Sequence, residues 1–175
     1  SMLALWAGEQ AFVISVIVTA SAQSCSYIKE LAMECEFPTV NASSDEIRAI
    51  FNEVKTIAVV GLSPDSSKDS HHVAEYLQQA GYKIVPIYPK ELTILGEKAY
   101  PSLADVPFAI DMVDIFRKPE ALDAIADAVI ARGDVKVFWS QLGVVNNAAA
   151  EKAKAAGMRV VQNKCTLVEH RKLGV

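Results

Sequence analysis

The chain has little cysteine, no cluster of basic residues and none of the motifs that mark metal-dependent or nucleophilic enzymes. Its three cysteines, Cys25, Cys35 and Cys165, are too few and too scattered for a disulfide framework or a zinc site, and they are typical of a reducing compartment. Seventeen Lys and Arg against 21 Asp and Glu give a net charge of −4, which argues against a general nucleic-acid-binding protein. Nucleophile elbow, P-loop and paired His or Cys spacings are also absent. We therefore expect a cytoplasmic protein without a metal site.

The first 43 residues differ from the rest, and we expect an apolar N-terminal extension and linker there. The apolar stretch at 11–20 is well short of the roughly 20 residues that cross a bilayer, and no Lys or Arg precedes it as in a secretory leader. The sequence therefore predicts no membrane span. It leaves open a targeting segment, or a strand or helix packed on the domain or on a second copy, which would make a homodimer. Residues 38–44 have the composition of a linker.

Residues 44–175 alternate apolar strand-like runs with amphipathic helical segments. The spacing of Ser43 and Glu46 predicts a capping box before the first helix. Strands are expected at 56–60, 83–87, 112–116, 135–139 and 158–161, and later helices at 70–80, 119–132, 146–156 and in the tail to 173. Continuous apolar strands between amphipathic helices indicate a parallel sheet that is covered on both faces. The sequence predicts an α/β domain with a Rossmann-like, doubly wound sheet of five parallel strands.

Ligands of such a domain bind at the carboxyl ends of the strands, so the residues after each strand are candidate contacts. After the first strand, glycine lets a ligand approach the backbone, and the next helix offers free N–H groups to an anion. The candidates in this loop are Gly61, Leu62, Ser63, Pro64, Lys68, Ser70 and His71. An ordinary Gly/Ser-rich turn is the alternative. Ser63 stands where the dinucleotide fingerprint requires a second glycine, so the signal for NAD is weak.

After the second strand, Pro89 and Lys90 take the place where an NAD site requires an acidic residue. A lysine suits a ribose phosphate, which is present in coenzyme A (CoA) and NADP. After the third strand, Arg117 and Lys118 can bind phosphate, and Phe116 can flank an adenine or a pantetheine arm. The alternatives are solvated lysines, a core phenylalanine, and an arginine paired with a nearby acid.

Four positive charges, on Lys68, Lys90, Arg117 and Lys118, converge on this edge of an acidic chain. After the fourth strand, Gln141 is expected to point into the cleft and Gly143 to make a turn. We expect Trp139 to be a core side chain and His170 to lie at the surface. Cys165 is expected to be a buried thiol, with a reactive thiol or one that pairs with CoA as the alternative.

The sequence around these candidates carries a family resemblance. The segment 57–64 resembles the opening of the small single-domain CoA-binding proteins, which share the CoA-binding domain of the succinyl-CoA synthetase alpha subunit. Further matching segments are 88–90 with 95–103, 113–117, 141–143, and Cys165 with 169–171. The resemblance covers about residues 44–173 and implies a Rossmann-like fold that binds CoA. It implies that Gly61, Ser63, Lys68, Ser70, Lys90, Phe116 and Arg117 are at ligand-contacting positions. Tyr88 stands where the family usually has Asn, and Lys68 where it often has Arg.

Two functions follow as hypotheses. The first is binding of CoA or an acyl-CoA by a module without catalysis, because the predicted cleft is basic but has no general base, nucleophile or metal site. The second is an NADP-dependent oxidoreductase or another nucleotide-using enzyme. The missing glycines and the lack of a Tyr-x-x-x-Lys pair argue against it. We expect the substitution Gly61→Val to block the ligand and to spare the fold.

Overall fold

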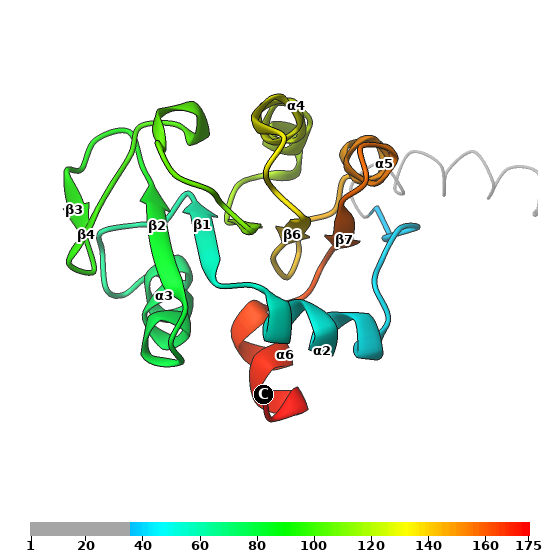
Figure 1. The fold of residues 1–175 in the computed structure, drawn as a ribbon, viewed down its shortest axis with the longest axis horizontal. Coiled ribbons are helices and arrows are strands. Elements are labelled where there is room, and N and C mark those ends of the chain that lie inside the picture. Colours follow the sequence, from blue (N-terminus) through cyan, green and yellow to red (C-terminus); the bar gives the residue numbers. More distant parts are fainter. Residues whose placement is uncertain (1–35) are drawn as a thin grey trace, which may run out of the picture. The chain divides into compact units, whose positions relative to one another are not determined.

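A parallel sheet lies between two layers of helices in the computed structural model, which describes residues 36–175 (Figure 1). Residues Pro38–Val175 form one compact unit. The strands are β1 (Thr56–Val60), β2 (Lys83–Ile87), β5 (Met112–Ile115), β6 (Val137–Ser140) and β7 (Arg159–Val161). All neighbours are parallel, in the order β2-β1-β5-β6-β7. This order confirms the predicted doubly wound, Rossmann-like sheet of five strands.

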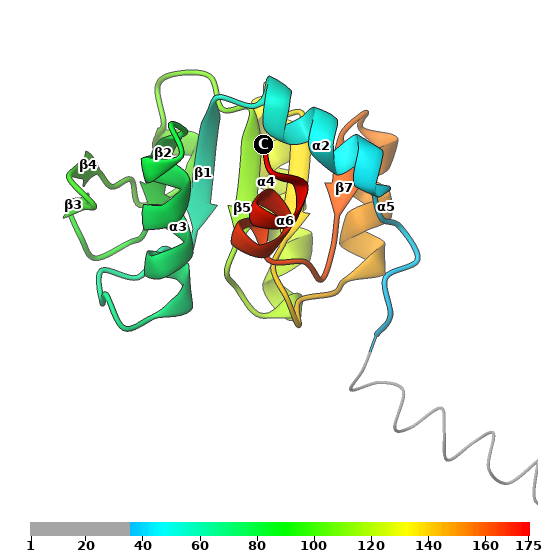
Figure 2. The ribbon, with the colours of Figure 1, turned by 90° about the horizontal axis from the view of Figure 1, so that it is seen from below.

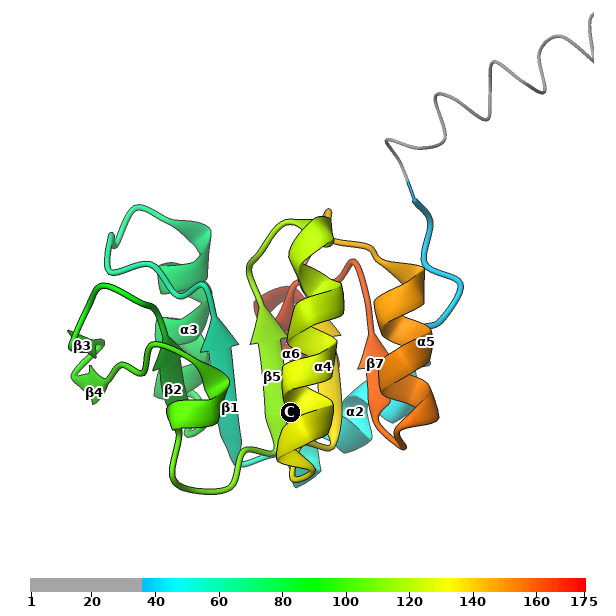
Figure 3. The same ribbon diagram turned by 90° about the horizontal axis from the view of Figure 1, so that it is seen from above.

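Helices cover both faces of the sheet. One layer holds α2 (Ser44–Glu53), α3 (Asp69–Gln79) and α6 (Thr166–Leu173), which are seen in front of the sheet in Figure 2. The other layer holds α4 (Leu122–Arg132) and α5 (Asn147–Ala155), which are in front in Figure 3. The predicted capping box is present at α2, where Ser43 and Glu46 each bond the other's backbone N–H.

The strand sequences explain why both faces are buried. Side chains alternate along a strand, and Ala58 and Val60 join one core cluster, with residues of α4 and α5, while Ile57 and Val59 join the other, with residues of α2, α3 and α6. All four are buried. A strand that is buried on both faces reads as a continuous apolar run, and this is the pattern that the sequence shows.

The topological switch point lies between β1 and β5, because the chain leaves β1 for β2 on one side and returns to β5 on the other. Gly61 follows β1 there with a φ of +83°, and a Cβ on this residue would lie 2.6 Å from the Phe116 carbonyl oxygen. Only glycine fits this approach of two backbones. The expectation that Gly61→Val spares the fold is therefore wrong, since the branched side chain would collide with the backbone.

Residues 38–44, expected to be a linker, are instead bound to the domain. The Asn41 Nδ2 donates to the Gln162 carbonyl (3.0 Å), and the Gln162 N–H donates to Asn41 Oδ1 (3.1 Å). The Gln162 Nε2 donates to the Val40 carbonyl, and the Val40 side chain is buried. Local composition could not reveal these partners because they lie more than a hundred positions away in the sequence. Residues 1–35, which hold the expected apolar extension, lie outside the described residues.

The structure also contains short elements that the sequence did not predict. A 3₁₀ turn, η2 (Pro119–Ala121), precedes α4, and a short hairpin of β3 (Thr93–Ile94) and β4 (Glu97–Lys98) was not predicted. A second 3₁₀ turn, η1 (Leu103–Asp105), follows this hairpin.

His170 is buried, contrary to expectation: its Nδ1 lies 2.9 Å from the Tyr76 hydroxyl, and the rings of Phe51 and Tyr82 pack against it edge-on. Burial lowers the pKa of His170, so the neutral ring is favoured.

Candidate functional site

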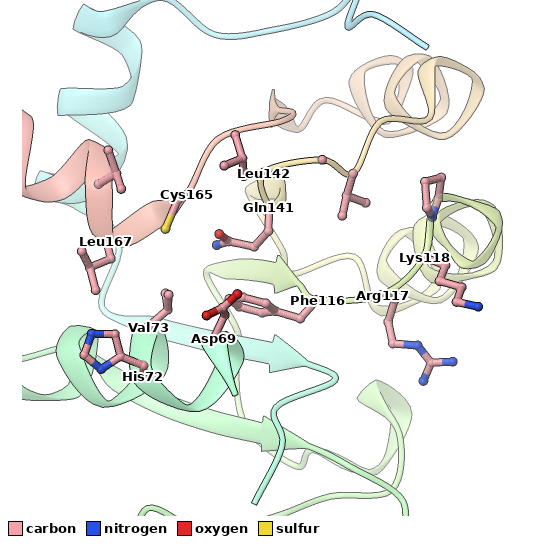
Figure 4. A pocket seen from close by; sticks show the side chains of 14 residues that line it. Asp69, His72, Val73, Phe116, Arg117, Lys118, Gln141, Leu142, Cys165 and Leu167 are labelled. Carbon is pink, nitrogen blue, oxygen red and sulfur yellow. The ribbon is translucent and has the colours of Figure 1, made fainter. Parts of the chain in front are cut away.

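A cleft of about 670 Å³ opens at the carboxyl ends of β5 and β6, next to the first turns of α3 and α6 (Figure 4). It lies beside the switch point, where a doubly wound domain binds its ligand. Its lining residues are Asp69, His72, Val73, Phe116, Arg117, Lys118, Pro119, Gln141, Leu142, Gly143, Val144, Cys165, Leu167 and Val168. The volume is in the range of small-molecule sites, about 300–1,000 Å³.

The two ends of the cleft differ in chemistry. Arg117 and Lys118 lie at one end in Figure 4, on the loop that follows β5. Cys165 and Leu167 lie at the other end, where the chain enters α6, and Gln141 lies between the two ends. The cleft therefore has a cationic end and an end with a thiol and apolar side chains.

Arg117 is exposed and forms no ion pair with any residue in 36–175. Lys118 is likewise exposed and unpaired within that part of the chain. The alternative interpretation, in which Arg117 pairs with an acid on a neighbouring helix, is therefore wrong for the described residues. Both side chains are free to bind an anion, and a guanidinium can hold a phosphate with two hydrogen bonds.

A buried polar network lies beneath Gln141, which lines the cleft. The Gln141 Nε2 donates to Asp114 Oδ1 (2.7 Å) and to Thr166 Oγ1 (2.9 Å), and the Thr166 hydroxyl donates to Asp114 Oδ2 (3.0 Å). Asp114 and Thr166 have no exposed surface, and Gln141 is 5% exposed. Burial raises the pKa of Asp114 to about 7, although its hydrogen bonds from Gln141 and Thr166 act in the opposite direction.

This network refines the expectation for Gln141. The side chain was expected to point into the cleft and it lines the cleft, but its NH₂ group is bound to Asp114 and Thr166 beneath. The Oε1 accepts no hydrogen bond from residues 36–175, and no buried side-chain N or O atom in that range lacks a partner. The Oε1 is therefore the amide atom that reaches the open cleft, where it offers an acceptor and not a donor.

Polar groups in the loop between β1 and α3 form hydrogen bonds with one another and with the first turn of α3. The Ser63 N–H donates to the buried Ser70 Oγ (3.0 Å), and the Asp65 N–H donates to Ser63 Oγ (3.1 Å). The His71 Nδ1 lies 2.9 Å from the Ser63 carbonyl oxygen, so this ring is held within the loop. Its neighbour His72 lines the cleft instead. The hydroxyls of both serines, which are candidate ligand contacts, therefore accept hydrogen bonds that hold the loop together.

The candidate residues fall into three groups. Those that line the cleft are Phe116, Arg117, Lys118, Gln141 and Gly143. Those that are exposed on the loops after β1 and β2, outside the cleft lining, are Pro64, Lys68, Pro89 and Lys90. Those in or beneath the β1–α3 loop are Gly61, Leu62, Ser63, Ser70 and His71. The Leu62 side chain is fully buried, so only its backbone could meet a ligand. Contact with a ligand stays a prediction for all of them.

Sequence reasoning missed several residues in or beneath the cleft. Asp69 and His72 line its wall, and Asp114 and Thr166 are buried beneath Gln141. One signal was available: Asp114 is an acidic residue inside an otherwise apolar strand, and such a residue needs a specific partner. The partner could not be read from the sequence because Thr166 lies 52 positions further along. Trp139 is a core residue as expected, and Cys165 is half-buried in the cleft wall.

Two general findings concern residues 36–175 as a whole. No three His, Cys, Asp or Glu side chains are grouped there so that they could hold a metal ion. No helix in this range has both the length and the apolar character that crossing a membrane requires.

The comparisons with known proteins agree with the fold. A family model described as a CoA binding domain matches residues 55–171. YneT, an uncharacterized protein of Bacillus subtilis, is 40% identical over 130 residues, which cover 74% of this chain and 96% of YneT. A hypothetical protein from Pyrococcus horikoshii has a solved structure with a TM-score of 0.74 and 37% identity, covering 81% of this chain and 99% of that one.

A larger relative matches only in part. The ADP-forming acetate–CoA ligase II of Archaeoglobus fulgidus is 38% identical over 63 residues, which are 35% of this chain and 9% of the ligase. The resemblance to the single-domain CoA-binding proteins is thus confirmed over most of the chain. On this evidence, the chain belongs to the CoA-binding domain family.

Proposed function

We propose that this protein binds CoA or an acyl-CoA in the cleft beside the switch point and performs no catalysis of its own. The observation that carries the proposal is the polarity of the cleft, which has unpaired Arg117 and Lys118 at one end and an apolar wall with a thiol at the other. CoA has the same polarity, with phosphates at one end and a thiol at the other.

The residues present fit such a ligand. Arg117 and Lys118 would bind phosphate by charge-assisted hydrogen bonds. Phe116 and Leu142 offer apolar surface to the pantetheine arm, and the free Oε1 of Gln141 would accept a hydrogen bond from one of its amide N–H groups. Lys90 follows β2 at the same edge of the sheet and would meet a phosphate on the ribose. The group itself supplies a thiol that carries acyl groups.

A non-catalytic role is supported by the way the ionisable groups are used. Both oxygens of Asp114 accept hydrogen bonds from Gln141 and Thr166, so this carboxyl group is not directed at a ligand. His71 is held by the Ser63 carbonyl, and His170 lies among aromatic rings away from the cleft lining. These three groups are therefore better arranged to support the fold than to move the protons of a ligand.

Two further proposals concern the setting of the protein. The scattered cysteines support a cytoplasmic location, where thiols stay reduced. A homodimer through the apolar stretch at 11–20 stays a prediction, because that stretch lies outside the described residues.

The direct test is calorimetric titration of the purified protein with CoA in the presence of a reductant, and with NADP in parallel. We expect saturable binding of CoA at about micromolar concentration and no heat with NADP; micromolar affinity corresponds to about 8 kcal/mol. Native mass spectrometry of the freshly purified protein would identify any acyl group that is carried. Binding of NADP and not CoA would favour the oxidoreductase, and failure to bind CoA at millimolar concentration would exclude the proposal.

A further inference from the structure

Asp114 is the one Asp or Glu side chain among residues 36–175 that has no exposed surface, and no ion pair neutralises it there. It stands inside β5, with Val59 of β1 and Trp139 of β6 aligned on either side. A buried carboxyl group without a cation costs free energy unless its hydrogen bonds compensate. The partners in those hydrogen bonds therefore indicate what Asp114 does in the structure.

The hydrogen bonds of Asp114 join three elements around the cleft. Gln141, just after β6, donates to Oδ1 (2.7 Å), and the Thr166 hydroxyl, at the start of α6, donates to Oδ2 (3.0 Å). Each element continues into the cleft lining, with Phe116 after β5, Gln141 itself after β6, and Leu167 in α6. The carboxyl group therefore lies where it can control how the cleft wall is presented.

Both side-chain hydrogen bonds run toward Asp114, as an ionised carboxylate requires. The Gln141 NH₂ also donates to Thr166 Oγ1 (2.9 Å), so the amide and the hydroxyl offer the carboxyl group donors and no acceptor. A proton on Oδ1 would face the NH₂ group across 2.7 Å, and a proton on Oδ2 would displace the Thr166 hydroxyl hydrogen from its acceptor. A protonated Asp114 thus leaves a buried donor unsatisfied in this arrangement, which is costly.

A half-turn of the Gln141 amide removes this conflict. The Oε1 atom would take the place of Nε2 and accept the proton on Oδ1, while the Thr166 hydroxyl would keep its bond to Oδ2. The terminal torsion of a glutamine side chain is soft, so the turn needs no movement of the backbone. After the turn, the NH₂ group and not Oε1 is on the cleft side, between the cationic end and the thiol end (Figure 4).

We propose that Asp114 is a positioning residue that sets the polarity of the cleft through Gln141. The ionised carboxylate holds the amide oxygen toward the ligand, and the protonated carboxyl group turns the NH₂ group toward it. The inference rests on the proposed function, because CoA is the ligand whose binding it regulates. A pantetheine N–H that meets Oε1 would face another donor after the half-turn, so the ionised state binds CoA more tightly.

Asp114 titrates in a range where this change affects binding. Burial raises its pKa to about 7, against hydrogen bonds from Gln141, Thr166 and the Ile115 N–H, and no charged group of residues 36–175 is among the causes. The buried residues of α2 are all apolar. The titratable or charged groups on the other packed elements are Asp69 and His72 of α3, Arg117 and Lys118 after β5, and Cys165 and His170 at α6.

The test is calorimetric titration of CoA under reductant at about pH 6 and about pH 8, in the wild type and in Asp114→Asn. We expect the wild type to bind CoA about fivefold more weakly at the lower pH, because Gln141 then loses its hydrogen bond to the ligand. Asn cannot ionise, so Asp114→Asn should bind weakly at both pH values. The phosphates of CoA and His72 are present in both titrations, so their effects cancel in the comparison.

The control Asp45→Asn makes the same change at an exposed position in α2 and should keep the wild-type affinities. Gln141→Met separates action through the amide from a direct effect of the charge, because it leaves Asp114 in place. We expect this variant to show no more pH dependence than Asp114→Asn. Equal pH dependence in the wild type and Asp114→Asn, or a wild-type pH dependence in Gln141→Met, would overturn the proposal.

The half-turn itself is measured without CoA, by NMR of isotope-labelled protein. We expect the side-chain carboxyl carbon of Asp114 and the side-chain nitrogen of Gln141 to titrate with one midpoint near neutral pH. A Gln141 signal that stays constant while Asp114 titrates would overturn the proposal, and so would an Asp114 that stays ionised from about pH 5 to 8.

These outcomes are distinct from those of the proposed function. If CoA binds with the same pH dependence in the wild type and in Asp114→Asn, the positioning role is wrong and the binding function stands. If CoA binds at neither pH, the binding function is wrong, whereas a shared midpoint for Asp114 and Gln141 would still support the change of polarity.

Discussion

Arg132 and Arg117 lie at opposite edges of the same sheet, and the structure uses them in different ways. Arg132 ends α4 near the amino ends of the strands, with a side chain that is 12% exposed and bonded to both carboxylate oxygens of Asp134 (3.1 and 2.8 Å). It also donates to the carbonyls of Leu103, Val106 and Phe108. Arg117, at the carboxyl edge, is exposed and has no ion pair within residues 36–175.

This difference distinguishes a charge that stabilises the fold from a charge that is available to bind a ligand. A guanidinium that donates to a carboxylate and three carbonyls is part of the structure, since removing it takes a donor from each of those groups. A guanidinium without partners beside a cleft adds nothing to stability, because an exposed charge is already well solvated. The residue type is the same, and only the set of partners tells the two roles apart.

The largest effect is expected from Arg132→Ala. Because the side chain is mostly buried and each of its four partners would lose a donor, the free energy of unfolding should fall by about 3–5 kcal/mol. Urea denaturation measures this change. The matched variant Arg117→Ala should alter stability by no more than about 0.5 kcal/mol. Similar losses from both substitutions would contradict the division between the two edges.

Asp114→Asn tests the buried carboxyl group beneath Gln141. The pKa of Asp114 in the folded state, about 7, lies above its unfolded value, so the folded protein keeps a proton that the unfolded chain releases. The contribution of Asp114 to the free energy of unfolding is therefore fully present below about pH 4 and is lost as pH rises to about 7. As pH rises from about 5 to 8, the variant should lose less free energy of unfolding than the wild type, by roughly 2–4 kcal/mol. The exposed-site control Glu91→Gln should leave the pH dependence unchanged.

An unaltered pH profile in Asp114→Asn would show that Asp114 stays ionised in the folded protein over this range. The hydrogen bonds from Gln141 and Thr166 would then outweigh the burial of the carboxylate. Urea midpoints at several pH values, with the slope of each transition checked for two-state behaviour, measure the profile.

Gly61→Ala should lower stability by a smaller amount. The control Gly96→Ala separates the cost of a steric collision from the cost of backbone strain. Both glycines have positive φ, +83° and +75°, so both substitutions strain the backbone. Only at Gly61 would the new Cβ meet the Phe116 carbonyl at 2.6 Å, whereas nothing lies within 4 Å at Gly96. We expect Gly61→Ala to cost about 1–2 kcal/mol more than Gly96→Ala in thermal unfolding. Equal costs would mean that the two loops at the switch point separate easily.

The sequence predicted the strands well because each is buried on both faces and therefore reads as a β-branched apolar run. It also predicted that the residues after β1 and β5 meet, since the carboxyl ends of parallel strands share an edge. Arg117 and Lys118 were found in this way, and both line the cleft.

What the sequence missed depends on contacts between distant residues. Asp114, Gln141 and Thr166 are spread over more than fifty positions, so the local pattern around each residue does not show that the three side chains meet. The burial of His170 depends on rings from α2 and α3, and the binding of residues 38–42 depends on Gln162. Periodicity reports which face of an element is buried, but it does not report which polar side chains meet there.

The central claim is that the unpaired charge at the carboxyl edge binds the phosphates of CoA. The most direct measurement is calorimetric titration of CoA into Arg117→Glu and Lys136→Glu, which make the same charge change at opposite edges of the sheet. We predict that Arg117→Glu weakens binding by about 1–3 kcal/mol and that Lys136→Glu leaves it unchanged. Equal affinities in the two variants would contradict the account and place the ligand elsewhere.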